Sequence, residues 1–197
     1  MGILRVKDFD FVDIEKVCPS IQLDLIYATK NNFTKEIQYP LAKCYLRRKV
    51  ALKLAKVQAE LEKLSLGLKI FDGYRPYSVT KKFWDLVADS RYVADLKEGS
   101  KHNRGAAIDV TLIDFDGREL EMPTAIDDMS KKAHRDYDKL PQQVIANRQL
   151  LEDIMMNGGF LPIETEWWHF DDSEWKKYPV EDLCIKELAR LEKVYAS

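Results

Sequence analysis

The chain has 197 residues, of which 46% are hydrophobic and 32% are charged, so it can bury one substantial core but is short for two. Its 31 basic and 33 acidic residues give a formal net charge of -2, which argues against partners recognised through bulk charge, such as nucleic acid or an anionic membrane surface. We therefore expect a single domain over residues 1–197 whose partner is a small molecule, with no nucleic acid and no membrane.

Short strands and one long helix are expected in the first part of the chain. Between 8 and 29 apolar and polar residues alternate, as in short extended pieces. From 46 to 64 apolar residues recur at spacings of three and four, with charged residues between them, which predicts an amphipathic helix. A buried strand is expected at 68–71, and it leads into the sequence DGYRP at 72–76. The proline of that sequence favours an extended backbone at Arg75, so the guanidinium is presented from a strand end.

A further helix and a hairpin are expected in the middle of the chain. Ser78 is a suitable N-cap for a helix that ends in the polar stretch before residue 99. A strand is then expected to run to about residue 112, and the Asp-Gly pair at 116–117 predicts a tight turn after it. Residues 122–141 are rich in charge and predict irregular structure.

Two helices and a strand pair are expected toward the C-terminus. An amphipathic helix is predicted over 144–156, where the glycine pair at 158–159 ends it. Residues 160–163 and 167–170 predict short strands paired with each other. Apolar residues at roughly helical spacing predict a closing helix from 180 to the end of the chain.

Cysteine usage and the N-terminus indicate the compartment. The cysteines Cys18, Cys44 and Cys184 are widely spaced, which argues against a disulfide framework and against a thiolate metal site. Residues 1–20 contain four acidic residues and no apolar run of signal-peptide length, and no later segment is apolar enough to span a bilayer. We expect a cytoplasmic protein; the alternative is an exported one whose signal was removed before Met1.

The segment GSKHNRGAAIDVT at 99–111 carries the first candidate metal ligands. His102 and Asp109 lie on either side of Gly105, at the entrance to the expected strand. Imidazole and carboxylate are zinc-type ligands, and a glycine turn is one way to aim both at a single ion. A polar turn that leads into a strand would explain the two residues without a metal, so a third ligand must come from elsewhere.

The chain has two other histidines, His134 and His169. His134 lies in a charged stretch and is expected to be solvated. His169 follows Glu166 by three residues, and this carboxylate supplies the proton acceptor that a metal-bound water needs. Residues three apart on a regular strand point to opposite faces, so Glu166 is expected just before the strand proper, at a bulge or at a strong twist. The aromatic residues around His169 are expected in the core.

Arg75 has two interpretations. It can be a buried salt-bridge partner for Asp72 or another carboxylate. Alternatively, it can stabilise an oxyanion beside a hydrolytic metal site, where a second positive charge is useful. The second role is the one we carry forward.

Longer stretches around these residues resemble the D-alanyl-D-alanine dipeptidases, zinc enzymes known from vancomycin resistance and from bacterial use of peptidoglycan dipeptides. The resemblance reaches to about residue 172 and is carried by LDLIYATKNNF, LRRKVALKLAKVQAEL, GLKIFDGYRP, SKHNRGAAIDVTL and EWWHF. The pattern SxHxxGxAxD is shared with a wider group of zinc D-Ala-D-Ala peptidases that have the fold of the hedgehog signalling domain. Its combination with DGYRP and EWWH is more specific to the dipeptidases.

The resemblance implies an α+β fold with a central antiparallel sheet flanked by helices, and zinc-dependent hydrolysis of the D-Ala-D-Ala dipeptide to D-alanine. It implies one zinc ion per chain, with Glu166 as general base and Arg75 as transition-state stabiliser. The implied zinc ligands are His102, Asp109 and His169, and the implied substrate contacts are Tyr27 and Asp127 at the free ammonium and Ser100 beside the substrate. The D preference rests wholly on this resemblance.

The chain also departs from the family pattern. Ile26 stands where relatives commonly have a basic residue, Lys35 stands where a glycine is common, and the span 76–100 is short. The helix expected from 180 lies beyond the matched part. A shorter span changes the walls of the substrate pocket, which leaves strict dipeptide selectivity open. Two alternatives to a dipeptidase are kept. One is a D,D-carboxypeptidase or endopeptidase acting on longer peptidoglycan stems, and the other is a non-catalytic hedgehog-like zinc-binding module.

Overall fold

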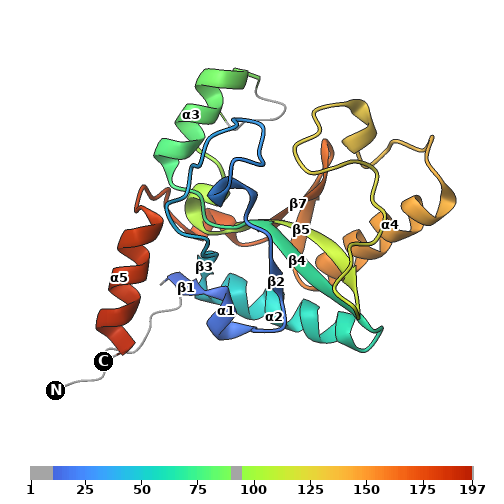
Figure 1. Cartoon of the computed structure of the whole chain (residues 1–197), viewed down its shortest axis with the longest axis horizontal. Helices are drawn as coiled ribbons and strands as arrows, with labels where there is room; N and C mark the ends of the chain where they lie inside the picture. Colours follow the sequence, from blue (N-terminus) through green and yellow to red (C-terminus); the bar gives the residue numbers. More distant parts are fainter. Residues whose placement is uncertain (1–10, 90–94, 197) are drawn as a thin grey trace.

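A computed structural model of the chain describes residues 11–89 and 95–196. Within these residues, a five-stranded sheet with the order β2-β4-β5-β7-β6 lies at the centre of the molecule (Figure 1). Its strands are β2 (Gln22–Leu23), β4 (Leu66–Asp72), β5 (Ala107–Asp114), β6 (Phe160–Ile163) and β7 (Glu166–Asp172). Neighbouring strands are antiparallel except β2, which lies parallel to β4 at one edge. The expected α+β fold with a central antiparallel sheet is confirmed.

The two longest helices cover one face of the sheet. α2 (Arg48–Glu62) and α4 (Gln142–Asn157) contact each other and the strands above them (Figure 1). The buried face of α2 carries Val50, Leu54, Val57 and Leu61, because residues three and four apart share one side of a helix. The other face of the sheet is left to loops and to the residues of the candidate site.

The remaining elements lie around this framework. α3 (Tyr77–Val87) stands on the opposite side of the molecule from α2, and α5 (Ile185–Ala196) lies at one end (Figure 1). The smaller elements are the paired strands β1 (Phe11–Asp13) and β3 (Tyr45–Arg47), the one-turn helix α1 (Ile14–Val17), and the 3-10 turns η1 (Ile26–Ala28), η2 (His102–Arg104), η3 (Lys131–Ala133) and η4 (Trp175–Lys177). Glu192 of α5 contacts Lys16 of α1 and Tyr45 of β3, which ties α5 to the small sheet.

Some boundaries differ from the expectations. β3 pairs with β1, so the long helix begins at Arg48 and not at 46. The stretch expected to be extended contains α1, which is capped by the Asp13 side chain; residues 8–10 of that stretch lie outside the described residues. The closing helix begins at Ile185 and not at 180. In the first two cases a short local element interrupts the expected pattern, whereas residues 180–184 form no regular element.

The predicted N-cap of α3 is wrong. α3 begins at Tyr77, with Pro76 in the N-cap position, and the N–H of Ser78 donates to Asp182 Oδ1 at 2.7 Å. A carboxylate more than 100 residues away in sequence therefore does the capping that Ser78 was expected to do. The end of the expected helix includes residues 90–94, which lie outside the described residues.

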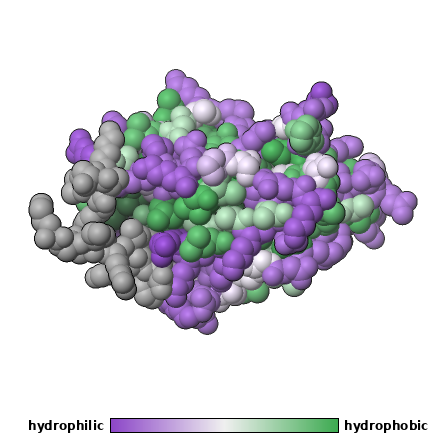
Figure 2. Space-filling model, turned by 90° about the horizontal axis from the view of Figure 1, so that it is seen from below, coloured by the Kyte–Doolittle hydropathy of each residue, from purple (hydrophilic) through white to green (hydrophobic). Residues whose placement is uncertain are grey.

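One continuous cluster of buried side chains fills the space between the sheet and the helices. It includes Trp167, Trp168 and Phe170, as expected for the aromatic residues around His169. The cysteines are free thiols. Among the described residues, every helix is too short or too polar to span a bilayer. The face shown in Figure 2 is mainly hydrophilic, with hydrophobic residues across its middle, a mixture that is ordinary for a folded chain.

Candidate metal centre

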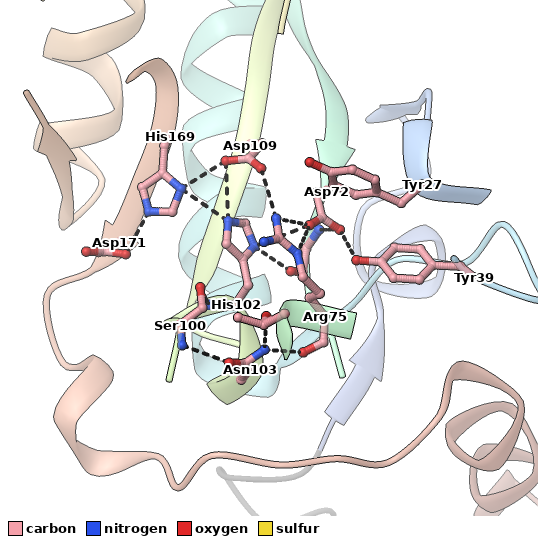
Figure 3. Close-up of polar contacts among 12 residues, drawn as sticks. Tyr27, Tyr39, Asp72, Arg75, Ser100, His102, Asn103, Asp109, His169 and Asp171 are labelled. Atoms are coloured by element: carbon pink, nitrogen blue, oxygen red, sulfur yellow. Dashed lines mark hydrogen bonds and ion pairs between the residues drawn. The ribbon is translucent and has the colours of Figure 1, made fainter. Parts of the chain in front are cut away.

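Three buried side chains from three elements converge on one point (Figure 3). His102 comes from η2, Asp109 from β5, and His169 from β7, where it is the direct cross-strand partner of Asp109. Asp109 Oδ1 lies 3.0 Å from His169 Nδ1 and 3.4 Å from His102 Nε2. The two imidazole nitrogens are 3.1 Å apart. The three residues predicted as metal ligands are thus brought together.

The turn between His102 and Asp109 depends on Gly105. Its φ is +65°, and a Cβ at this position would lie 2.3 Å from Cε1 of Phe11, so both the backbone angle and the space require glycine. The N–H of Gly105 donates to His102 O, and its carbonyl accepts from the N–H of Arg47. These bonds hold the histidine turn against β3.

The spacing of the three ligand atoms fits a tetrahedral zinc site. Zinc–nitrogen and zinc–oxygen bonds of about 2.0–2.1 Å in a tetrahedron place neighbouring ligand atoms about 3.3 Å apart. The separations of 3.0, 3.1 and 3.4 Å bracket this value. Two imidazoles and one carboxylate are also a donor set that leaves a fourth position open, as in catalytic zinc sites.

Second partners fix which nitrogen of each histidine faces the site. His102 Nδ1 lies 2.7 Å from the carbonyl oxygen of Gly73, and His169 Nε2 lies 2.9 Å from Asp171 Oδ1. A carbonyl and a carboxylate can only accept, so each of these nitrogens carries the proton and the other nitrogen presents its lone pair. Asp171 was missed in the sequence, although a carboxylate two residues after a strand histidine shares its face.

The charges in the cluster are balanced against burial. Burial raises the pKa of Asp109, but the imidazoles of His102 and His169 outweigh it and hold that pKa far below its usual value. Burial lowers the pKa of His169, but the carboxylates of Asp171 and Asp109 outweigh it and raise that pKa to about 10. The carboxylates of the cluster therefore favour a positive charge between the two imidazoles. A divalent cation can supply this charge in place of an imidazole proton.

Glu166 lies beside the three converging residues because β7 bulges. Pro162 of β6 pairs with Phe170, whereas the next residue, Ile163, pairs with Glu166. An advance of one residue along β6 therefore corresponds to four residues along β7. Glu166 Oε2 is 3.9 Å from His169 Nδ1. Of the three expected arrangements, the bulge is the one that the structure shows. Burial, with Asp109 nearby, raises the pKa of Glu166 to about 8, although His169 opposes the shift.

Arg75 fits both of its interpretations. Its Nε and Nη2 donate to Asp72 Oδ2 at 3.0 and 2.7 Å, which is the salt bridge considered first. Its Nη2 also lies 3.9 Å from Asp109 Oδ2, so the guanidinium faces the cluster (Figure 3). The guanidinium stands over the rings of Tyr27 and Phe83, with its carbon 5.1 and 4.8 Å from their centroids. The salt bridge thus orients a cation toward the site.

Two polar residues around Arg75, Tyr39 and Asn103, were missed in the sequence. Asp72 accepts from Tyr39 Oη at 2.8 Å as well as from Arg75, so it is held from two sides. Asn103 Nδ2 donates to the carbonyl of Arg75 at 2.8 Å, and its Oδ1 accepts from the N–H of Ser100 at 2.7 Å. Asn103 therefore links the arginine segment to the histidine turn. This contact could not be predicted from a local sequence pattern.

The residues predicted to bind the substrate also lie near the cluster. Tyr27 Oη is 3.0 Å from both carboxylate oxygens of Asp127, and Asp127 adopts a left-handed backbone with φ +63°. Burial and the charge of Asp109 raise the pKa of Asp127 to about 7. Ser100 is buried, and its Oγ accepts from the N–H of His102 at 3.2 Å, so Ser100 braces the histidine turn.

His134 takes no part in the convergence of the metal-type ligands. It was expected to be solvated, which is wrong: the residue is half-buried, and among the described residues its Nε2 is a buried atom with no hydrogen-bond partner. The neighbouring Lys131 and Lys132 are exposed.

Comparisons with known proteins match most of this chain to one family. A family model described as D-Ala-D-Ala dipeptidase, peptidase family M15, matches residues 7–186. A D-alanyl-D-alanine dipeptidase of Escherichia coli is 36% identical over 171 residues, covering 87% of this chain and 89% of that protein. One from Enterococcus faecalis is 30% identical over 181 residues, covering 81% and 90%. A solved LD-carboxypeptidase structure, LdcB, is 20% identical with a TM-score of 0.48 and covers 92% of this chain and 77% of its own.

Proposed function

The chain belongs to the D-Ala-D-Ala dipeptidase family of peptidases, and from this premise we propose that it hydrolyses D-Ala-D-Ala to free D-alanine with one zinc ion per chain. The proposed ligands are His102 Nε2, Asp109 Oδ1 and His169 Nδ1. The observation that carries the proposal is the convergence of these three atoms within 3.4 Å of one another, beside the half-buried carboxylate of Glu166. A structural zinc site more often has four protein ligands and no free carboxylate next to them.

Glu166 is the proposed general base. When bound, zinc would supply a Lewis acid that lowers the pKa of a water molecule and polarises the scissile carbonyl. Glu166 would accept the proton of the attacking water and then pass it to the leaving amine. Its position supports this role, because Glu166 Oε2 lies 3.9 Å from the ligand atom His169 Nδ1, and a general base must be close to the proton that it accepts.

Arg75 is the proposed partner of the developing oxyanion. The salt bridge to Asp72 and the rings of Tyr27 and Phe83 hold its guanidinium in one orientation. A preoriented cation costs no reorganisation when charge develops on the substrate oxygen. Its positive charge lies on the side of Asp109 that faces away from His169 (Figure 3).

Tyr27 and Asp127 are the proposed contacts of the dipeptide ammonium. Asp127 is a half-buried carboxylate that accepts from a tyrosine hydroxyl, and it gains a counter-ion when an ammonium binds. This gain favours a free N-terminus and therefore a dipeptide over the interior of a longer chain. Ser100, which holds the histidine turn from beside the cluster, is the third proposed substrate neighbour.

The test is release of alanine from D-Ala-D-Ala, L-Ala-L-Ala and a pentapeptide that ends in D-Ala-D-Ala, each with zinc and with a chelator. Zinc-dependent cleavage of D-Ala-D-Ala alone is expected. Cleavage of the pentapeptide would instead indicate a D,D-carboxypeptidase. Zinc binding without cleavage of any of the three would contradict the proposal and favour a binding module.

A further inference from the structure

The bulge in β7 needs something to hold it. Residues three apart on a regular strand face opposite sides, yet Glu166 and His169 lie 3.9 Å apart at one site. We propose that Arg135 is the positioning residue that holds this bulge and so places His169 and Glu166 for metal binding and proton transfer. The proposal rests on the function proposed above for these two residues.

The β6–β7 ladder cannot hold the bulge by itself. The register jumps between Pro162 and Ile163, whose partners are Phe170 and Glu166. A proline has no N–H to donate to a neighbouring strand. A carbonyl at the bulge that loses a ladder donor needs one from outside the ladder, because a buried carbonyl without a partner is costly.

Arg135 supplies donors at both ends. Its Nε donates to the carbonyl of Ile163 at 2.8 Å, and its Nη2 donates to the carbonyl of His169 at 2.9 Å. Its own backbone N–H donates to the carbonyl of Glu164 at 2.9 Å. One residue thus bonds the end of β6, the turn that follows it and the strand position of a proposed metal ligand.

Arg135 is itself held on its remaining sides. Its Nη1 donates to Glu152 Oε2 of α4 at 2.9 Å, and its guanidinium carbon lies 4.5 Å from the centre of the Phe170 ring. The side chain is 10% exposed. A guanidinium is a rigid planar fork of donors, so fixing one edge on α4 and one face on Phe170 fixes the direction of the others. Arg135 thereby fixes the position of β7 relative to α4.

The chain offers a matched control in Arg148. Its Nη1 donates to the carbonyls of His134 and Tyr137, at 3.2 and 2.9 Å. It is a buried arginine that braces the same loop through two carbonyls, but these bonds do not reach β7. Arg148→Gln therefore removes a comparable amount of loop support and leaves the bulge contacts in place.

The experiment compares wild type, Arg135→Gln, Arg135→Lys and Arg148→Gln. The readouts are the zinc dissociation constant from competition with a chromogenic chelator, the visible spectrum of the cobalt form, thermal unfolding, and kcat and KM for D-Ala-D-Ala. Arg135→Gln is expected to weaken zinc binding about 10-fold or more, the range for loss of an outer partner of a metal ligand. It should also change the cobalt spectrum and lower kcat, with little change in KM.

Arg135→Lys keeps the charge but can reach only one carbonyl, so its zinc affinity is expected between those of wild type and Arg135→Gln. It also serves as the test if Arg135→Gln does not fold. Arg148→Gln is expected to lose thermal stability while keeping wild-type zinc affinity and cobalt spectrum.

Wild-type zinc affinity and kcat in a folded Arg135 variant would overturn the proposal, as would an equal loss of affinity in Arg148→Gln. A wild-type protein that binds zinc but leaves D-Ala-D-Ala intact would instead refute the proposed function. The role of Arg135 would still be tested in that case, because zinc affinity and the cobalt spectrum do not depend on turnover.

Discussion

Replacing Asp171 with asparagine tests whether the orientation of His169 depends on its outer partner. The carboxylate accepts from His169 Nε2 at 2.9 Å and holds the proton on that nitrogen. An amide can turn its NH2 toward Nε2, which favours the other tautomer and removes the lone pair from Nδ1. Loss of such a partner typically weakens metal binding by about 10- to 100-fold, which corresponds to about 1.4–2.7 kcal/mol.

The same carboxylate has a second partner that provides the control. Lys101 Nζ lies 3.7 Å from Asp171 Oδ2, and the lysine side chain is 37% exposed. Lys101→Gln removes this ion pair without touching His169, and an exposed pair contributes about 0–1 kcal/mol.

The assay is the zinc dissociation constant of Asp171→Asn, Lys101→Gln and wild type, measured by chelator competition at one pH. We expect a large loss in the first variant and a loss of about 5-fold at most in the second. Wild-type affinity in Asp171→Asn would refute the tautomer argument. Equal losses in both variants would assign the effect to charge alone.

Three further outcomes are expected. Glu166→Gln should keep zinc but lower kcat about 100-fold or more, as measured by D-alanine release together with metal analysis; wild-type turnover would remove Glu166 as the base. Gly105→Ala should lower the Tm, because its φ of +65° and the 2.3 Å approach to Phe11 both oppose a side chain; an unchanged Tm in a thermal melt would contradict this. Burial raises the pKa of Tyr45 and of Tyr74 above the usual value, so their contribution to stability is complete below about pH 10 and is lost as the pH rises further. Denaturant unfolding across this range should show Tyr74→Phe with a shallower decline than wild type, and an equal decline would contradict the assignment.

Local patterns in the sequence were sufficient for the main elements. The spacing of apolar residues predicted α2 because one helix face is buried throughout, and Leu54 and Leu61 lie on that face. The strand rule applied to Glu166 and His169 predicted that Glu166 lies before the strand, at a bulge or at a strong twist, because a regular strand could not bring both side chains to one ion. The bulge is the alternative that the structure shows.

Capping of α3 shows the opposite case. Ser78 has the right residue type at a plausible place, but the helix starts one residue earlier and Asp182 accepts from its N–H. A cap supplied by a distant carboxylate leaves no trace in the local sequence. The helical turn at Ile14–Val17 was missed because its length of four residues is too short to show a helical period.

The residue types of the candidate site could be read from the sequence: two imidazoles and a carboxylate of zinc-ligand type, a second acidic side chain and an arginine at a strand end. The nitrogen of each histidine that faces the centre could be identified only from the folded chain, since it depends on Gly73 and Asp171. The contacts of Arg135 at the bulge are likewise visible only in the folded chain. The physical reason is that ligand chemistry belongs to a side chain, whereas orientation comes from hydrogen bonds between residues that are distant in the chain or on different elements.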